Sequence, residues 1–429
     1  MVLFLGLAAM GAAQPAPEAE DAALRHARQL LKTTPLIDGH NDLPREIYDY
    51  PKAPGDVDAY DLRTRRPGET DLPRMRQGGM GGQFWSVWVP GEIKTGYARQ
   101  MLQQIDIARR MIARYPDSLA LALTADDVER EFKRGRIASL IGMEGGYAIE
   151  NSLALLRNYY LLGVRYMILT HNVTHDWGDA ARDEARHNGL TPFGKEVVRE
   201  MNRLGMLVDL SHTSAKVMSD ALDVTAAPVI FSHASARALV NHPRNVPDEI
   251  LTRVAKNHGV VMVTFIPSYV SGEVVKWIAD LDAQLKKGRS PEEAKRIMQQ
   301  YVAAHSPIPH ATLTQVADHI EHVRKVAGAD GVGIGSDYWG GNAGGLPEQP
   351  VEQALSLVGM PVGLEDTSKY PYLIAELIRR GWPDADLKKV AGLNVIRALR
   401  DAEVVSRRLQ QTRPASTATF EQLDGAHGK

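Results

Sequence analysis

Several residues that could bind a metal ion or transfer a proton stand at the ends of short apolar runs. The first are His40 and Asp42, which follow an apolar run that reads as a strand. Residues two apart on a strand point the same way, so an imidazole and a carboxylate here form half of a site for a divalent metal. Alone, the pair is better explained by a tight turn at Gly39 and a helix cap at Asp42.

The same pattern recurs along the chain, and this favours the metal interpretation. Five further apolar runs end on a residue of the same chemical kind, namely Glu144, His171, His212, His233 and Asp337. Two more apolar runs, residues 84–89 and 259–265, carry no such residue at their ends. The sequence therefore predicts eight strands, six of which end on a group able to bind metal or move protons.

The elements that must position these residues alternate between strands and helices. Helical periodicity separates most of the apolar runs, as in residues 98–115, 125–134, 191–204 and 248–257. This alternation predicts right-handed βα units and a parallel sheet, and continuously apolar runs are typical of strands buried on both faces. We expect an α/β fold, a (β/α)8 TIM-like barrel with helical insertions and a metal site at the C-terminal ends of the strands. An open doubly wound sheet would draw its ligands from only one or two loops.

Composition limits the class of protein. The 429 residues suit one large barrel with insertions, and a formal net charge of −2 gives no reason to expect a nucleic-acid partner. The absence of cysteine excludes disulfides and thiolate ligands. Any metal must be held by nitrogen and oxygen, which favours zinc, manganese or cobalt.

The chain divides into a large central domain and short flanking segments. Residues 1–13 resemble the apolar core of a signal peptide without its basic leader, although an apolar helix with no export role is the alternative. We expect an N-terminal segment at 14–32, a single barrel domain that carries the metal site at 33–405, and a polar tail at 406–429 that lacks the apolar end of a lipid-anchor signal. The expected location is therefore periplasmic or secreted, without a stable membrane anchor.

A long segment before the last strand, residues 269–330, reads as a helical excursion. Ser290 followed by Pro-Glu-Glu is typical of a helix start. Such an insertion either shapes substrate access or serves as packing, and the sequence leaves both open.

Taken together, several motifs resemble the membrane (renal) dipeptidase family of the amidohydrolase superfamily, over roughly residues 33–400. In chain order the motifs are Asp38-Gly-His-Asn-Asp-Leu-Pro44, Glu144-Gly-Gly146, Leu169-Thr-His-Asn172, Val208-Asp-Leu-Ser-His212, Val229-Ile-Phe-Ser-His233, Asn245-Val-Pro-Asp248 and Val362-Gly-Leu-Glu-Asp-Thr-Ser-Lys-Tyr-Pro371. One departure is visible at the last strand. This chain reads Asp337-Tyr-Trp-Gly340 where many members have a second acid, so Trp339 puts the pocket shape and substrate preference in doubt.

The resemblance implies a zinc-dependent dipeptidase with two Zn²⁺ ions per chain. One ion would be bound by His40, Asp42 and Glu144, and the other by Glu144, His212 and His233, so that Glu144 bridges them. His171 and Arg244 match the family's substrate-binding residues, and Asp337 matches its proton-handling aspartate. The implied partners are small dipeptides, with L,L substrates expected and L,D substrates left open, and a homodimer is expected from the same likeness.

These residue types suit hydrolysis of a peptide bond. Two metal ions can hold a hydroxide between them while polarising a carbonyl. Asp337 would then act as general base and acid, His171 would donate to the oxyanion, and Arg244 would bind a free carboxylate. Two of these residues have a structural alternative: Asp337 could be a loop cap and Arg244 could form a surface ion pair.

Nearby residues of similar chemistry are assigned to structure. His175, Asp176 and Asp179 are expected to form a polar loop at the rim, and Trp85 and Trp88 are expected to serve packing.

Two other functions remain open from the sequence. One is an amidohydrolase that acts on another small amide or a lactone, but such enzymes more often bridge their metals with a modified lysine, and no suitable lysine ends a strand here. The other is a metal-binding relative that has lost catalysis, against which the retention of Asp337 argues.

Overall fold

The structure, a computed structural model, describes residues 21–286, 290–340 and 356–425. The predicted signal-like segment, residues 1–13, lies outside the described residues, as does the end of the predicted polar tail. No helix among the described residues combines the length and apolar character needed to cross a membrane.

The predicted eight-stranded parallel barrel is confirmed. Its strands follow one another around the ring in chain order, each paired in parallel with the next, and the pairing of β2 with β4 closes the ring. The barrel strands are β1 (Leu36–Asn41), β2 (Met80–Trp88), β4 (Ile137–Glu144), β5 (Val164–Ile168), β6 (Leu207–Asp209), β7 (Val229–Phe231), β8 (Val260–Val263) and β9 (Val332–Ile334).

One strand was not predicted. β3 (Leu119–Leu121) pairs with the first residues of β4, outside the closed ring. Three residues are too short to give a periodic signal, which is why sequence analysis passed over this strand.

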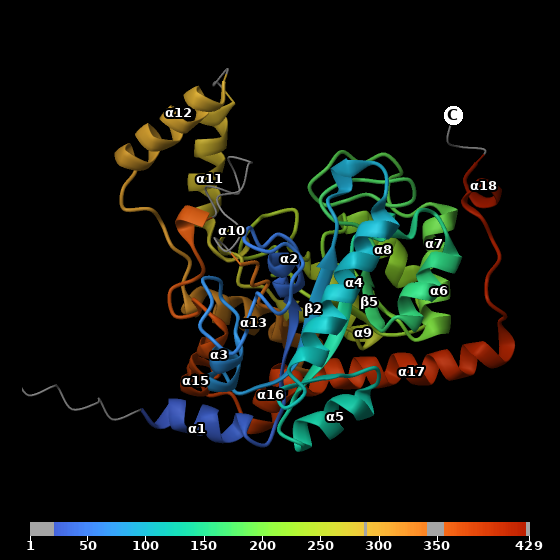
Figure 1. Cartoon of the computed structure of the whole chain (residues 1–429), viewed down its shortest axis with the longest axis horizontal. Coiled ribbons are helices and arrows are strands. Elements are labelled where there is room, and N and C mark those ends of the chain that lie inside the picture. The colour runs from blue at the N-terminus through green and yellow to red at the C-terminus, as the bar shows by residue number, and fades with distance from the viewer. Residues whose placement is uncertain (1–20, 287–289, 341–355, 426–429) are drawn as a thin grey trace, which may run out of the picture.

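Helices surround the barrel, and one of them covers its amino-terminal end. The four helices predicted by range are present within one residue as α4 (Tyr97–Arg114), α5 (Ala125–Lys133), α7 (Pro192–Leu204) and α9 (Asp248–Asn257). The long α17 (Asn394–Thr412) runs across the base of the molecule in Figure 1. Its apolar residues join inward-facing strand residues such as Tyr166 in one buried cluster, so this end of the barrel is closed.

The remaining helices complete the outer layer and the loops. They are α1 (Ala22–Leu31), α2 (Leu43–Tyr48), α3 (Leu72–Gln77), α6 (Leu153–Leu161), α8 (Ala215–Val224), α10 (Pro267–Val270), α13 (Leu313–Ala327), α15 (Tyr370–Arg379), α16 (Asp384–Lys388) and α18 (Phe420–Leu423). Short helical turns follow β2 at Gly91–Ile93 and β4 at Gly146–Ile149.

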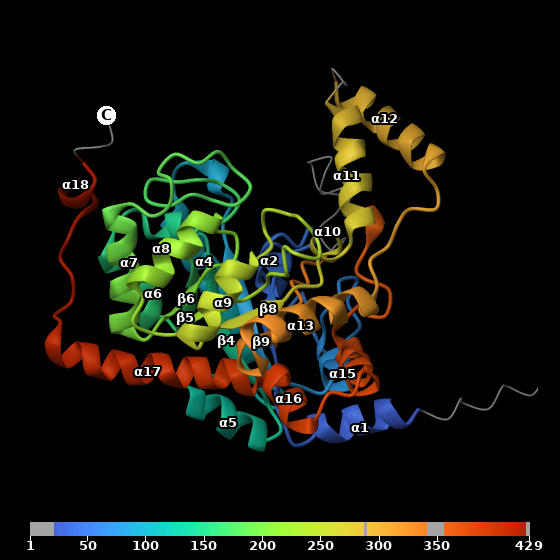
Figure 2. The ribbon, with the colours of Figure 1, turned by 180° about the vertical axis from the view of Figure 1, so that it is seen from behind.

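Only part of the predicted helical excursion, residues 269–330, projects from the barrel, because α13 within this range packs against α9 and β9. The rest is a projecting arm. It consists of α11 (Gly272–Leu285) and α12 (Pro291–Ala304), which stand away from the barrel on the side opposite α17 (Figures 1 and 2). The arm has a small core of its own that includes Trp277 and Tyr301. Ser290 caps α12 by accepting a hydrogen bond from the backbone N–H of Glu293, so the predicted helix start is confirmed.

Candidate metal centre

The carboxylate of Glu144, at the end of β4, lies at the middle of a group of histidines. Its Oε1 is 2.9 Å from Nε2 of His212 and 3.6 Å from Nε2 of His233. Its Oε2 is 3.5 Å from Nε2 of His40. The two carboxylate oxygens therefore face different histidines, and all of these side chains are at least nine-tenths buried.

Two aspartates complete the group. Asp42 Oδ1 lies 3.4 Å from His40 Nε2, and Asp337 Oδ1 lies 3.8 Å from the same nitrogen. Asp337 Oδ2 is 3.9 Å from His233 Nε2, so this carboxylate faces ligands of both predicted sets. Three overlapping clusters of potential ligand atoms result: His40 with Glu144 and His233, Glu144 with His171 and His212, and His40 with Asp42 and Asp337.

The polar atoms of the centre fit a bound cation. Nε2 of His40 and Oδ1 of Asp42 are buried and have no hydrogen-bond partner among the described residues, whereas buried polar atoms normally have one. Nε2 of His212 and Nε2 of His233 lie 3.0 Å apart, a distance at which two imidazoles can share at most one proton. Imidazole nitrogens and carboxylate oxygens are the donor set of zinc and related divalent metals, so the residues present fit such an ion.

Two neighbours that sequence analysis missed orient the histidines. The hydroxyl of Tyr166, on β5, lies 2.9 Å from Nδ1 of His40, and the hydroxyl of Ser232 lies 2.9 Å from Nδ1 of His233. Contacts to the far ring nitrogen fix the tautomer and direct Nε2 at a metal. Ser232 stands directly before His233 and could have been suspected, whereas nothing local in the sequence links Tyr166 to His40.

The backbone is unusual at two of the site residues. His212 and Asp337 have positive φ values of 63° and 61°, which residues other than glycine seldom adopt. Such conformations persist where the surrounding structure imposes them, often at functional sites. Here the backbone N–H of Asp337 donates to the carbonyl of His40, which ties the loop after β9 to β1.

Burial and mutual charge set the protonation of the centre. Burial, together with the negative charges of Asp42 and Glu144, raises the pKa of Asp337 to about 7 against the opposing positive charge of His40. Burial also raises the pKa of Glu144, but the surrounding histidines outweigh it and hold the value well below the ordinary range.

The ligand histidines differ from one another. Burial lowers the pKa of His40, but the neighbouring Tyr166, Glu144 and Asp42 outweigh it and hold the value well above the ordinary range. Burial, together with the positive charge of Arg244, holds the pKa of His212 well below its ordinary value, and burial does the same for His233. Neutral imidazole is the form that binds metal.

His171 lies beside the ligands at the mouth of the centre. Its Nε2 is 3.7 Å from Oε1 of Glu144, and its Nδ1 is 3.4 Å from the hydroxyl of Tyr147. The ring of Trp88 lies 5.4 Å from the His171 ring, whereas Trp85 is fully buried in the core. Packing is therefore the role of Trp85, but Trp88 also lines the site.

Arg244, in the loop after β7, is a buried cation whose guanidinium makes no hydrogen bond to the described residues. Only 1% of its surface is exposed, yet none of its three side-chain nitrogens has a hydrogen-bond partner among the described residues. The guanidinium lies 5.2 Å from the ring centroid of Tyr269, a cation–π contact. A buried unpaired charge is costly, so this position suits an anion supplied from outside the chain. The alternative of a surface ion pair is wrong, because the side chain is buried.

The other predicted polar residues lie outside the centre. His175 Nε2 contacts the carbonyl of Leu169, and Asp179 accepts hydrogen bonds from backbone N–H groups, including that of Gly189. Asp176 accepts from Asn151. These residues belong to the loop after β5, as the sequence predicted.

A (β/α)8 barrel with a buried nitrogen–oxygen ligand set at the C-terminal ends of its strands defines the class of metal-dependent hydrolases. Residues 24–413 match the family model of the membrane dipeptidases, peptidase family M19, and the chain belongs to this family. It is accordingly a metallopeptidase of the dipeptidase type, a hydrolase acting on peptide bonds.

Individual relatives agree with this assignment. Dipeptidase verJ of Clonostachys rogersoniana is 40% identical over 404 residues, which cover 91% of this chain and 90% of that protein. Among solved structures, the probable dipeptidase PvdM from Pseudomonas aeruginosa has a TM-score of 0.73 at 24% identity, covering 89% of this chain and 99% of that one. A metallo peptidase from Rhodobacter sphaeroides, liganded with a phosphinate mimic of the dipeptide L-Ala-D-Ala, has a TM-score of 0.66 at 22% identity. The match covers 86% of this chain and 99% of that one. The two structural likenesses support the fold.

Proposed function

We propose that this chain is a zinc-dependent dipeptidase that uses two metal ions. The observation that carries the proposal is the position of Glu144, whose two carboxylate oxygens face different histidines. His40 and Asp42 would bind one ion and His212 and His233 the other, with Glu144 shared between them. When bound, such ions supply acidification of water and polarisation of the scissile carbonyl.

The side chains around the ligands suit the remaining parts of peptide hydrolysis. Asp337 faces both ligand sets and, with its raised pKa, is suited to take a proton from water and return it to the leaving amine. Neutral His171 is suited to donate a hydrogen bond to the developing oxyanion, in an environment where one such donor contributes about 3 kcal/mol.

Arg244 is the residue proposed to restrict the substrate to dipeptides. Its planar guanidinium can bind a carboxylate through two parallel hydrogen bonds. A free C-terminal carboxylate placed there, one residue beyond the scissile bond, distinguishes a dipeptide from a longer peptide. The Rhodobacter relative was solved with a dipeptide mimic, which accords with a substrate of this size.

The test is metal analysis combined with a dipeptide assay. The protein as purified should contain about two equivalents of zinc, hydrolyse L,L-dipeptides, lose activity with a chelator and regain it with Zn²⁺. Glu144→Gln should weaken both equivalents together, because one carboxylate serves each ion. One equivalent at full activity would exclude the shared ligand, and absence of dipeptide hydrolysis by the metal-loaded protein would overturn the substrate assignment. The export of the protein, its assembly into a homodimer and the domain boundaries at residues 33 and 405 stay predictions.

A further inference from the structure

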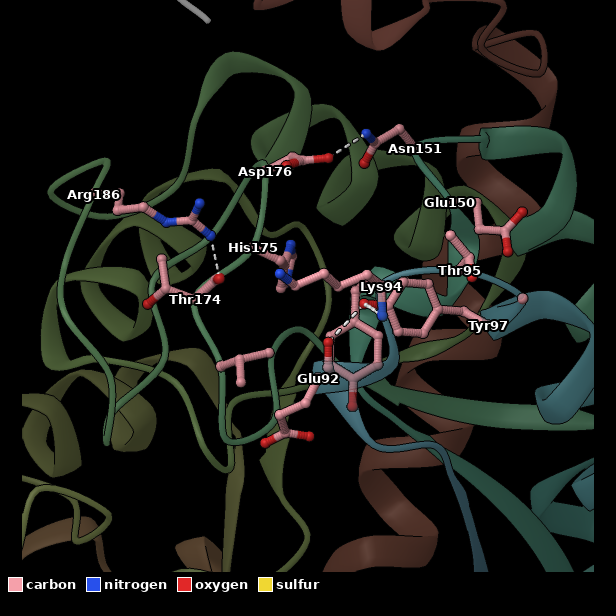
Figure 3. Close-up of a pocket in the computed structure, with 14 residues that line it drawn as sticks. Glu92, Lys94, Thr95, Tyr97, Glu150, Asn151, Thr174, His175, Asp176 and Arg186 are labelled. Atoms are coloured by element: carbon pink, nitrogen blue, oxygen red, sulfur yellow. Dashed lines mark hydrogen bonds between the residues drawn. The ribbon is translucent and has the colours of Figure 1, made fainter.

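A hollow lies beside the metal centre, and binding of the metals or of the substrate carboxylate does not explain it. It has a volume of about 840 Å³ and lies among the loops that follow β2, β4 and β5 (Figure 3). Charged and aromatic side chains line it, among them Glu92, Lys94, Tyr97, Tyr147, Glu150 and Asp176.

The hollow adjoins the catalytic side of the centre through Tyr147. The Tyr147 ring lies 5.0 Å from the ring of Tyr97 and 5.9 Å from the ring of His175, both of which line the hollow. The hydroxyl of the same tyrosine lies 3.4 Å from Nδ1 of His171. Tyr147 is therefore shared between the hollow and the mouth of the metal centre.

The order of strands places the hollow opposite Arg244. Arg244 follows β7, and in the closed ring β2 is four strands away from β7 in either direction. A dipeptide whose carboxylate is held at Arg244 and whose scissile carbonyl lies near Glu144 must direct its N-terminal residue across the barrel mouth. That direction leads to the loops after β2 and β4, which contribute Glu92, Lys94 and Glu150 to the hollow.

The backbone of these loops is also unusual. Seven residues other than glycine have positive φ among the described residues, and three of them, Lys94, Glu150 and Asn151, line this hollow. His212 and Asp337, in the metal centre, account for two more. Backbone conformations of this kind concentrate at binding and catalytic sites.

The charges of the hollow are unequal. Three carboxylates, Glu92, Glu150 and Asp176, face two cations, Lys94 and Arg186, and the Arg186 guanidinium also donates to the carbonyl of Thr174. Burial raises the pKa of Tyr97, and although a hydrogen bond from the backbone of Lys94 opposes this, the charges of all three carboxylates raise it further. The residues that line the hollow therefore carry one more negative than positive charge.

We propose that this hollow is the subsite for the side chain of the substrate's N-terminal residue, and that it favours a long cationic side chain such as lysine or arginine. The inference rests on the proposed dipeptidase function. Asp176 is the carboxylate best suited to test it, because it lies on the β5 loop away from the ligands and is held in place by a 2.7 Å hydrogen bond from Asn151.

The size of the subsite is tested with a filling variant. Thr95 lines the hollow on its exposed rim, so Thr95→Trp should occupy the space without touching the ligands. We expect kcat/KM for Lys-Ala to fall tenfold or more while that for Ala-Ala changes less than twofold. Thr314→Trp, an exposed threonine on α13, is the matched control and should leave both substrates unchanged. An equal loss for both substrates in Thr95→Trp would overturn the proposal.

The charge preference is tested with an isosteric variant. The wild type should favour Lys-Ala over Glu-Ala about tenfold, and Asp176→Asn should lower the ratio of Lys-Ala to Gln-Ala two- to fivefold, the size expected for one exposed ion pair. High salt should reduce the wild-type preference for Lys-Ala over Glu-Ala, because it screens the charges of the hollow.

The control for this variant lies on the projecting arm. Asp280→Asn removes the same charge there and should leave the ratio of Lys-Ala to Gln-Ala unchanged. A wild type that prefers Glu-Ala, or an unchanged ratio in Asp176→Asn, would overturn the cationic assignment. Failure of the metal-loaded wild type to hydrolyse even Ala-Ala would instead refute the dipeptidase function itself.

Discussion

The guanidinium of Arg244 is buried without a hydrogen-bond partner in the described part of the chain, so its contribution can be measured through the substrate. Amidation of a dipeptide's C-terminus removes the negative charge and leaves the scissile bond unchanged. We expect amidation to cost about 1–3 kcal/mol in kcat/KM, because a charge-assisted contact is lost and the cation stays unpaired.

Variants of Arg244 provide the control. The difference in kcat/KM between free and amidated dipeptides should be far smaller in Arg244→Ala than in the wild type, because the variant has no guanidinium that amidation could leave unpaired. Arg244→Lys should restore only part of the difference, because an ammonium cannot reproduce the planar fork. A wild type that hydrolyses dipeptide amides and tripeptides as fast as dipeptides would contradict this role.

A variant of Asp337 can distinguish a role in proton transfer from a role in metal binding. Its carboxylate oxygens lie 3.8 Å from His40 Nε2 and 3.9 Å from His233 Nε2, farther than the closest ligand contact of Glu144. We expect Asp337→Asn to retain both metals and to lower kcat about a hundredfold or more. The metal content and kcat, measured on the same preparation, distinguish these two roles. Loss of a metal equivalent in this variant would make Asp337 a ligand, as one of the possible clusters allows.

At the scale of elements, the contact of β4 with β5 supports the metal centre. Gly142 on β4 packs against the ring of Tyr166 on β5, and a Cβ at this glycine would lie 1.9 Å from the ring's Cζ atom. Tyr166 in turn contacts His40 through its hydroxyl. A side chain at position 142 would therefore displace a residue that orients a ligand.

We expect Gly142→Ala to destabilise the fold by about 1–3 kcal/mol through overpacking. It should also weaken metal binding about 10- to 100-fold, the range observed when a residue that supports a ligand is lost. Urea unfolding of the metal-free protein measures the first effect, and metal titration measures the second. Gly272→Ala on α11 is the control, because a Cβ there meets no atom within 4 Å. Unchanged metal affinity in a destabilised Gly142→Ala protein would show that Tyr166 does not support His40.

At the scale of the whole molecule, a buried histidine links an outer helix to the loop after β7. His319 on α13 is 1% exposed, and its Nδ1 accepts a hydrogen bond of 3.0 Å from the backbone N–H of Ala236. Burial lowers the pKa of His319 to about 4. Since the ordinary value is near 6.5, the unfolded chain takes up this proton as the pH falls and the folded chain does not, so folding free energy is lost between pH 6.5 and 4.

We expect His319 alone to reduce the free energy of unfolding by roughly 2 kcal/mol between pH 7 and pH 5. His319→Asn should be less stable at pH 7, yet it should lose correspondingly less stability on acidification. Urea unfolding of chelated protein at the two pH values gives the comparison. His258→Asn, at an exposed position that ends α9, is the matched control for the substitution itself. Equal acid sensitivity in His319→Asn and the wild type would exclude a neutral buried His319.

The sequence by itself determined the strands of the barrel and the residues at their ends. Apolar runs and the polar residue that follows each of them are local features, and parallel strands bring their carboxyl ends to one edge. His40 and Glu144 could therefore be predicted to meet without knowledge of the packing, and their placement 3.5 Å apart agrees with this. The helix start at Ser290 could be predicted for the same reason, because a cap involves only neighbouring residues.

Only the tertiary structure decided what surrounds those residues. Tyr166 contacts His40 across 126 positions of sequence, and no periodicity encodes which side chain reaches a given ring nitrogen. The burial of Arg244 and the hollow beside Tyr147 likewise depend on how separate loops pack over the barrel mouth. Strand order and ligand type are set by short-range patterns, whereas burial, orientation and pocket shape arise from contacts between segments far apart in the chain.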